Sequence, residues 1–231
     1  MDTHAPAGPT EGAAARTPLT RDRVMQGALD LADTIGVETF TMRRLATALD
    51  VKPMTIYHYV AGKEQIIDGI VDLVFAQIRL PPEDVPWIEA LRIRCHSARE
   101  VLARHPWATA LMETRSSPGP ANLEHHDAML GCLRRGGLTI EQTVHAYGII
   151  DSYLFGFALQ EGAALEDRAE LGAAADRIAA RAPMADYPNL DEVMGHVVQH
   201  GYSLASAFDF GLDLILEGIE RMAPGERTGS T

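Results

Sequence analysis

Apolar residues recur through the first sixty residues at the three- and four-residue spacing that marks one face of a helix. The first such stripe begins after Thr20, a residue type that caps helix starts, and stops at Gly36, a common helix end. Thr41 precedes a second stripe and Asp50 a third, so three short helices are expected between residues 20 and 62. Their apolar positions are Val24, Ala28, Leu31, Ala32 and Ile35, then Leu45, Ala46 and Leu49, then Val51, Ile56 and Val60.

The rest of the chain continues with longer helical stripes. Its clearest helix start is Thr139 with Gln142, because the two side chains can form a capping box. After Gly162 the pattern weakens into an alanine-rich helix, and Asn189 is expected to cap the helix that follows. The other expected helices cover residues 63–80, 84–104, 107–113, 121–135, 140–161, 189–201 and 203–222. Since no useful run alternates apolar and polar residues, the sequence predicts an all-α fold.

Composition sets the class of protein. Hydrophobic residues make up 46% of the chain and the mean hydropathy is -0.06, which is ordinary for a globular protein. No apolar run approaches the roughly 20 residues of a membrane span, so no membrane partner is expected. Cys95 and Cys132 are too few for a disulfide scaffold, and Cys95 continues an apolar stripe, which favours a reducing, cytoplasmic setting.

Charge is divided unevenly. The chain carries a net charge of -12, yet residues 16–65 hold seven Lys and Arg against six acidic residues. This head is therefore at +1 and the remainder at -13. A near-neutral head can bind phosphates locally, and an acidic body would keep it facing the DNA.

The second and third stripes meet the requirements of a helix-turn-helix. Ala46 is small enough for close packing of the third helix, and Asp50 tolerates the left-handed backbone of the turn. Short polar, aromatic and cationic side chains, typical of DNA reading, then occupy the third helix and its ends. They are Lys52, Thr55, Tyr57, His58, Tyr59 and Lys63. Either tyrosine taken alone fits equally well as a packing residue of a small core.

These residues resemble the TetR family of transcriptional regulators, over residues 20–80. The pattern is Gly-x-x-x-x-Thr-x-Arg-x-Leu-Ala-x-x-Leu-x-Val, then Thr-x-Tyr-x-Tyr/His-x-x-x-Lys. It falls here on Gly36, Thr41, Arg43, Leu45, Ala46, Leu49, Val51, Thr55, Tyr57, Tyr59 and Lys63. The resemblance implies double-stranded operator DNA as a partner and homodimers that place two heads in successive major grooves.

The resemblance also implies roles for individual residues. Phosphate contacts position such a domain and base contacts specify its sequence. Met42 and Arg43 would meet the duplex from the second helix, and Tyr57 and Lys63 would hold phosphates. Pro53, Met54, Thr55 and His58 would face base edges, and Lys52 and Tyr59 complete the expected surface. The expected organisation is a disordered arm (1–18), a helix-turn-helix domain (19–62), a connecting helix (63–80), a ligand-binding and dimerisation domain (81–223) and a tail (224–231).

The C-terminal part resembles the regulatory domain of the tetracycline repressors. Trp87 follows a proline-rich break as it does there, and two runs, Gly137–Gln142 and Phe208–Ile219, resemble their equivalents. In that fold the helix opened by Thr139 and the last helix pair with their symmetry mates in a four-helix bundle. The resemblance therefore implies dimerisation through the second apolar face of these helices. The expected dimerisation residues are Ile150, Phe208, Phe210 and Leu214.

The ligand site departs from the tetracycline pattern. The resemblance implies a drug–magnesium chelate held by His, Asn and His, but Arg79, Arg94 and Met112 stand at those positions. No metal and no cofactor are therefore expected. A wide, mostly apolar cavity for a small hydrophobic multi-ring effector is expected instead, although each methionine alone fits as core filler. The expected ligand-binding residues are Arg94, Ala98, Met112, Arg115, Met129, Tyr147, Asp151, Leu154 and Phe155.

Together these patterns predict a ligand-responsive repressor, not an enzyme, that controls an efflux or antibiotic-related gene. One alternative is a small metal-dependent enzyme, because His196 and His200 have a metal-ligand spacing on a helix. A third ligand is not evident, and no Glu follows His196 as a zinc protease requires. The other alternative is an activator or a constitutive regulator without a ligand.

Overall fold

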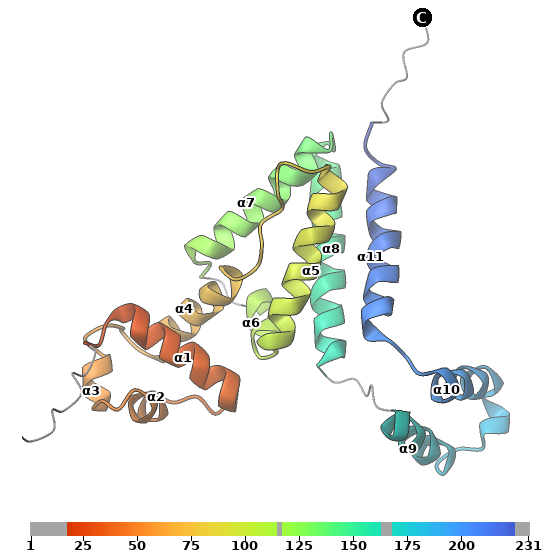
Figure 1. Cartoon of the computed structure of the whole chain (residues 1–231), viewed down its shortest axis with the longest axis horizontal. Helices are drawn as coiled ribbons and strands as arrows, with labels where there is room; N and C mark the ends of the chain where they lie inside the picture. Colours follow the sequence, from red (N-terminus) through yellow and green to blue (C-terminus); the bar gives the residue numbers. More distant parts are fainter. Residues whose placement is uncertain (1–17, 115–116, 163–167, 225–231) are drawn as a thin grey trace, which may run out of the picture.

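A computed structural model describes residues 18–114, 117–162 and 168–224, and every regular element in these ranges is a helix (Figure 1). The all-α prediction is confirmed. The α-helices are α1 (Arg21–Ile35), α2 (Met42–Ala48), α3 (Pro53–Ile56), α4 (Lys63–Phe75), α5 (Trp87–Arg104), α6 (Ala108–Thr114), α7 (Pro120–Arg135), α8 (Ile140–Glu161), α9 (Arg168–Ala179), α10 (Pro188–His200) and α11 (Leu204–Glu220). A 3-10 turn, η1 (Met184–Asp186), joins α9 to α10.

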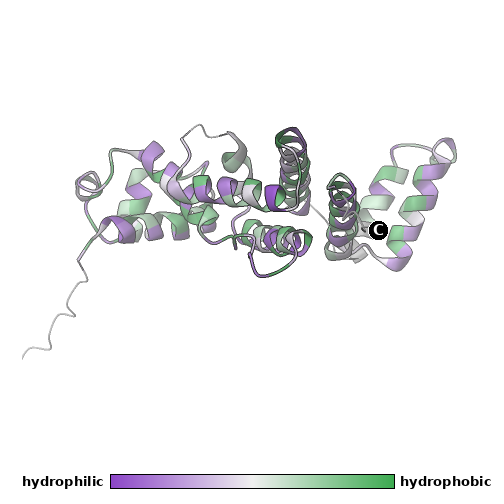
Figure 2. Ribbon diagram, turned by 90° about the horizontal axis from the view of Figure 1, so that it is seen from above, coloured by the Kyte–Doolittle hydropathy of each residue, from purple (hydrophilic) through white to green (hydrophobic). Residues whose placement is uncertain are grey.

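The helices form three parts along the long axis of the molecule. The small head of α1 to α3 lies at one end, and α4 runs from it into a body formed by α5, α6, α7 and α8 (Figure 1). Helix α11 lies beside α8, and α9 and α10 form a hairpin at the opposite end. Figure 2 shows the same order from above, with the hairpin beyond α8 and α11. The head and the hairpin are therefore separated by the whole body.

Local capping signals set the helices of the head. Thr20 Oγ1 accepts a hydrogen bond from Arg23 N at 3.2 Å, and Thr41 Oγ1 accepts one from Arg44 N at 3.2 Å. Gly36 ends α1 with a φ of 73°. Between these caps the apolar stripes are buried as expected, except that Leu31, Ile35 and Val51 are only partly buried.

The connecting helix is shorter than predicted, because α4 ends at Phe75 and not at Leu80. After Phe75 the backbone tightens into a turn, in which Gln77 N donates to Val74 O and Ile78 N to Phe75 O. Arg79 N then donates to Ser97 Oγ on α5 at 2.9 Å. This contact with the body takes the chain out of the helix before Pro81 is reached.

Two other predicted helix starts have different outcomes in the structure. The capping box at Thr139 is confirmed, since Gln142 N donates to Thr139 Oγ1 and Thr139 N donates to Gln142 Oε1. The expected cap at Asn189 is wrong, because α10 already begins at Pro188. Proline suits the first position of a helix, where its missing N–H is not needed. The predicted arm falls, apart from residue 18, outside the described residues, and so does the tail after residue 224.

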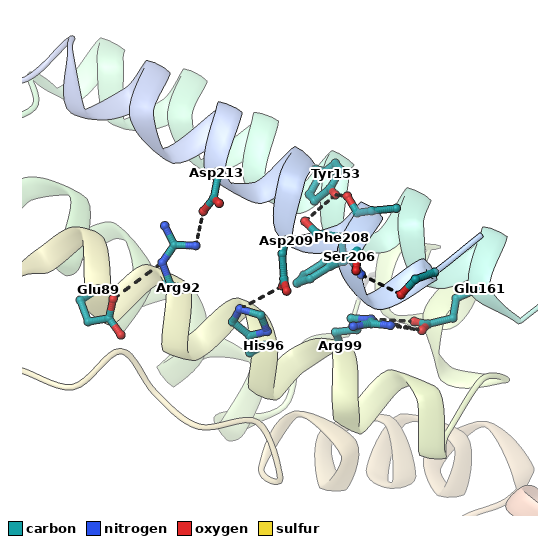
Figure 3. Close-up of polar contacts among 12 residues, drawn as sticks. Glu89, Arg92, His96, Arg99, Tyr153, Glu161, Ser206, Phe208, Asp209 and Asp213 are labelled. Atoms are coloured by element: carbon teal, nitrogen blue, oxygen red, sulfur yellow. Dashed lines mark hydrogen bonds and ion pairs between the residues drawn. The ribbon is translucent and has the colours of Figure 1, made fainter. Parts of the chain in front are cut away.

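Helix α11 is fastened to the body by ion pairs and aromatic contacts (Figure 3). Arg92 of α5 pairs with Asp213, and His96 Nε2 lies 3.5 Å from Asp209 Oδ1. Tyr153 of α8 stacks on Phe208 with ring centroids 5.6 Å apart, and its hydroxyl donates to Phe208 O at 2.9 Å. The last turn of α8 is tied to α5 in the same region, where Arg99 pairs with Glu161.

The packing of α11 on α8 depends on Gly211. A Cβ atom there would lie 2.3 Å from the Tyr153 hydroxyl oxygen, and the ring cannot yield without losing its stacking and its hydrogen bond. We predict that Gly211→Ala destabilises the protein by about 1–3 kcal/mol, the usual cost of overpacking. Urea denaturation at a fixed protein concentration measures it.

The matched control is Gly131→Ala in α7, where a Cβ would meet only Arg135 Nη1, at an ordinary 3.8 Å. It should stabilise the protein by about 0.5–1 kcal/mol, because alanine loses less backbone freedom in a helix. Equal effects of the two substitutions would contradict the close approach at Gly211.

Candidate functional site

The head forms a helix-turn-helix. Asp50 is the one non-glycine residue with positive φ among the described residues, at 51°, so it takes the left-handed turn position expected of it. Val51 N donates to Ala46 O at 3.0 Å and closes the turn. Ala46 is 1% exposed, as close packing of α2 and α3 requires, and Ile56 of α3 is fully buried beside it.

Most residues expected to read DNA lie on one exposed surface of α2 and α3. Arg43, Lys52, Pro53, Met54, Tyr57 and His58 are exposed, and Met42, Thr55 and Tyr59 are partly buried. Met54 is 71% exposed, so its apolar side chain is available for contact outside the head. Tyr59 packs against the core, so part of its role is structural.

Lys63 has a different environment from the other cations. Its ammonium donates to Phe40 O at 2.9 Å and to Val37 O at 3.5 Å, and it lies 5.9 Å from the centre of the Phe40 ring. Two of its three donors therefore tie the start of α4 to the loop before α2. A phosphate contact, as the resemblance implies, would use the remaining one.

A cavity of about 440 Å³ opens between α6, α7 and α8. Its aromatic wall contains His126 and Tyr147, whose ring centroids are 5.5 Å apart. The ring centroid of Phe75, on α4, lies 6.3 Å from that of His126. Its lining residues are Met112, Pro118, Asn122, His126, Tyr147, Gly148, Asp151 and Ser152. A second cavity of about 450 Å³ lies within the α9–α10 hairpin, lined mostly by small and aliphatic side chains.

Only part of the expected ligand site lines the cavity of α6 to α8. Met112, Tyr147 and Asp151 do so. Ala98, Met129 and Leu154 are at most 1% exposed and Phe155 is 6% exposed, so they pack in the core between helices, and contact with a ligand stays a prediction for them. Arg115 falls outside the described residues. The sequence reading missed Asn122, His126 and Ser152, although Asn122 and His126 share a helix face at a spacing of four.

Arg94 is the most unusual buried residue of the body. It is 2% exposed, and its Nη1 lies 3.6 Å from Oδ1 of Asp151, too far for a hydrogen bond. Arg94 Nε and Nη1, Asp151 Oδ1 and His125 Nδ1 are buried without a hydrogen-bond partner. Burial and, next, the Arg94 charge lower the pKa of His125 to about 4, so this ring is neutral near pH 7.

Two polar contacts join the surroundings of the cavity to the connecting helix and to the head. Asp72 of α4 caps α7, accepting from Asn122 N at 2.9 Å and from Ala121 N at 3.4 Å. Asn122 also lines the cavity, so a carboxylate of the connecting helix holds a cavity wall. Gly119 permits the contact, since a Cβ there would lie 2.2 Å from the Asp72 carboxyl carbon.

The second contact reaches α1 directly. Asp33 Oδ1 lies 2.7 Å from both His105 Nδ1 and Trp107 Nε1, in the segment between α5 and α6. His105 Nε2 also lies 3.2 Å from Gln77 Oε1, at the end of the connecting segment. The segment that starts α6, and thereby carries Met112 to the cavity, is thus hydrogen bonded to the head.

The outer surface of α8 and α11 is apolar and exposed. Phe210 is 68% exposed and Leu214 is 55% exposed, as a partner-facing surface requires. Ile140, Val144, Ile149 and Leu159 of α8 are exposed as well. Ile150 and Phe208 were misplaced by the prediction, because they are at most 1% exposed and lie in the core of the chain itself.

Other candidate sites have weaker support. His196 and His200 stack with ring centroids 4.3 Å apart, but no group of three His, Cys, Asp or Glu side chains suited to a metal occurs among the described residues. In the same ranges, no helix is long and apolar enough to cross a membrane.

The helix-turn-helix head and the helical body together define a transcriptional regulator that binds DNA. The family model described as "Tetracyclin repressor-like, C-terminal domain" matches residues 80–223, more than half of the chain. This chain belongs to the TetR family of transcriptional regulators.

Three relatives illustrate the match. An HTH-type transcriptional regulator of Saccharopolyspora erythraea is 30% identical over 89% of this chain and 86% of its own length. The HTH-type transcriptional repressor DrrR1 of Streptomyces coeruleorubidus is also 30% identical, over 90% and 80%. The Streptomyces coelicolor TetR family protein ActR, in its complex with actinorhodin, has a TM-score of 0.74 at 26% identity and covers 91% of this chain and 100% of its own.

The surface of α2 and α3 leads to a direct prediction. Arg43→Ala and Tyr57→Ala should each weaken binding to a duplex selected from random sequences by about 10- to 100-fold, the usual loss for a base or phosphate contact. Fluorescence anisotropy measures the affinity, and sedimentation checks that the oligomeric state is unchanged. Arg181→Ala, which removes the same charge from an exposed site after α9, is the control. Full affinity of both head variants would contradict this assignment of the surface.

Proposed function

We propose that the protein is a homodimeric repressor that leaves its operator when a hydrophobic multi-ring compound binds in the cavity of α6 to α8. The observation that carries this proposal is a pair of hydrogen-bonded links next to that cavity. Asp72 of the connecting helix α4 holds the backbone of Asn122 in the cavity wall, and Asp33 of the head holds the segment that starts α6. An occupant that displaces Asn122 or the start of α6 moves a group attached to α4 or α1. The helix-turn-helix spacing then no longer matches two successive major grooves, roughly 34–36 Å apart.

The apolar surface of α8 and α11 supports the dimer in this proposal. Phe210 and Leu214 would pack against a second copy, and two heads would then be held at a fixed separation. Release requires that the effector bind the non-matching state more tightly than the DNA-bound state. The Asp72 and Asp33 contacts are two places where the two states can differ, and so can differ in their affinity for the effector.

The chemical class of effector is inferred from the lining. Met112 and the rings of His126 and Tyr147 give an adaptable wall suited to flat ring systems. The lining as a whole is more polar than the mostly apolar cavity predicted from the sequence, because it also contains Asn122, Asp151 and Ser152. ActR, a relative in structure, was solved with actinorhodin, and tetracycline repressors are relatives in sequence, so an efflux or antibiotic-related target gene is proposed. A thioether is a poor ligand for Mg²⁺, and the Arg94 charge beside Asp151 disfavours a divalent cation there.

Release should accordingly not need a metal ion. We predict that flat, multi-ring aromatic compounds dissociate the protein from its selected duplex equally well with excess Mg²⁺ and with EDTA. Anisotropy titrations under both conditions measure the effect. A release that disappears on chelation would contradict the metal-free cavity, and no release by any multi-ring compound would contradict the proposed effector class.

The Asp33 contact should carry part of the response. With the most active compound of that titration, Asp33→Ala should bind the effector normally but show at least about fivefold less weakening of DNA binding, since coupling of this kind amounts to about 5- to 150-fold. Asp30→Ala is the matched control, because Asp30 lies one turn earlier on α1, is exposed and pairs only locally with Gln26. Equal coupling in the two variants would exclude Asp33 from the response.

A further inference from the structure

Four buried polar atoms without a hydrogen-bond partner belong to three residues of the body, one of which lines the cavity. They belong to Arg94 of α5, His125 of α7 and Asp151 of α8, and Asp151 lines the cavity itself. A buried polar atom without a hydrogen bond costs stability, so nearly all such atoms in proteins are satisfied by some group. Of the three residues only Asp151 lines the cavity, so its carboxylate is the group for which an occupant of the cavity can supply the missing partner.

The charges of the cluster restrict that ligand. Arg94 and Asp151 compensate one another at 3.6 Å, and His125 is neutral near pH 7. A carboxylate would suit Arg94 but face the negative charge of Asp151, and an ammonium group would suit Asp151 but face Arg94. A hydroxyl group suits both, because it donates to a carboxylate and accepts from a guanidinium.

His126 adds a second acceptor on the same wall. Its Nδ1 lies 2.8 Å from Asn122 O, and a carbonyl oxygen can only accept, so Nδ1 carries the hydrogen. In the neutral ring Nε2 is then an acceptor. The polar lining therefore offers acceptors at Asp151 and His126, while the rings of His126 and Tyr147 offer a stacking surface.

We propose that the effector is an uncharged, hydroxylated aromatic compound, and that Asp151, backed by Arg94, selects it by accepting a hydrogen bond from one of its hydroxyl groups. This rests on the proposed function, because it specifies the chemistry of the same cavity. Asp151 contacts the hydroxyl group, and Arg94 acts through Asp151 as a positioning residue that supplies the opposite charge.

The test compares three small probes with the full-length protein: a dihydroxyanthraquinone, its dimethyl ether and an anthraquinone carboxylate. The dihydroxy compound should bind at least about tenfold more tightly than the ether, because hydrogen bonds to charged groups are among the stronger ones. It should also bind more tightly than the carboxylate. Isothermal titration calorimetry gives the three affinities, and anisotropy gives release from the selected duplex.

Asp151→Asn provides a readout that a merely structural role would not produce. The substitution keeps the shape of the side chain but leaves the Arg94 charge uncompensated, so the preference should invert and the carboxylate should now bind best. Asp127→Asn, the same chemical change at an exposed site of α7 outside the cavity, should retain the preference of the native protein. Thermal unfolding and DNA affinity check that each variant is folded.

The outcomes separate this inference from the function on which it rests. Equal affinity for the dihydroxy compound and its ether, with release of DNA by both, would overturn the hydroxyl selection and leave the proposed repressor intact. An unchanged preference in Asp151→Asn would also overturn it. Failure of all three probes to bind would overturn both the hydroxyl selection and the multi-ring effector class.

Discussion

The architecture depends on one hydrogen-bonded cap that crosses between helices. Helix α7 begins with Gly119 and Pro120, so it has no side chain of its own to satisfy its first amides. Asp72 of α4 supplies the missing acceptor to Ala121 and Asn122. Because a carboxylate at a helix start also interacts favourably with the helix dipole, α4 and α7 are held together at the edge of the cavity.

With this cap, α4 is attached at both of its ends, to the head at one and to the body at the other. At its start, Lys63 ties it to the carbonyl groups of the head, and at its other end Asp72 and the Arg79 contact to Ser97 tie it to the body. A helix of thirteen residues fastened at both ends transmits a displacement better than it absorbs one. The Asp33 contact acts in parallel, since it joins α1 to the segment before α6.

Signals carried by neighbouring residues could be predicted from the sequence. The caps at Thr20, Thr41 and Thr139 involve partners three residues away, and the left-handed turn at Asp50 is a property of one residue. The Asp72 and Asp33 contacts join residues about fifty and seventy positions apart, and no local pattern specifies such partners. Hence the helices and the head could be predicted, while the links between head and cavity could not.

The cavity was predicted only in part for a related reason. The body helices are apolar on more than one face, because one face packs inside the chain and another stays exposed or lines the cavity. Composition alone therefore does not tell the face in the core from the face that is exposed or lines the cavity. Helix α8 illustrates this, as Ile149 is 50% exposed and its neighbour Ile150 is 1% exposed. A one-residue error of phase therefore placed Ile150 at the interface.

The burial of Arg94 is best understood as a cost accepted for selectivity. An apolar residue in its place would pack without unpartnered atoms, and buried ion pairs often add nothing to stability over such a replacement. The pair also acts on Cys95, whose thiol has a pKa that burial raises and the Arg94 charge lowers in part. An opposed pair of charges penalises any ligand that carries a net charge of either sign, while a neutral hydroxyl group satisfies both. The apolar wall then provides affinity, and the Arg94–Asp151 pair decides which flat aromatic molecules are admitted.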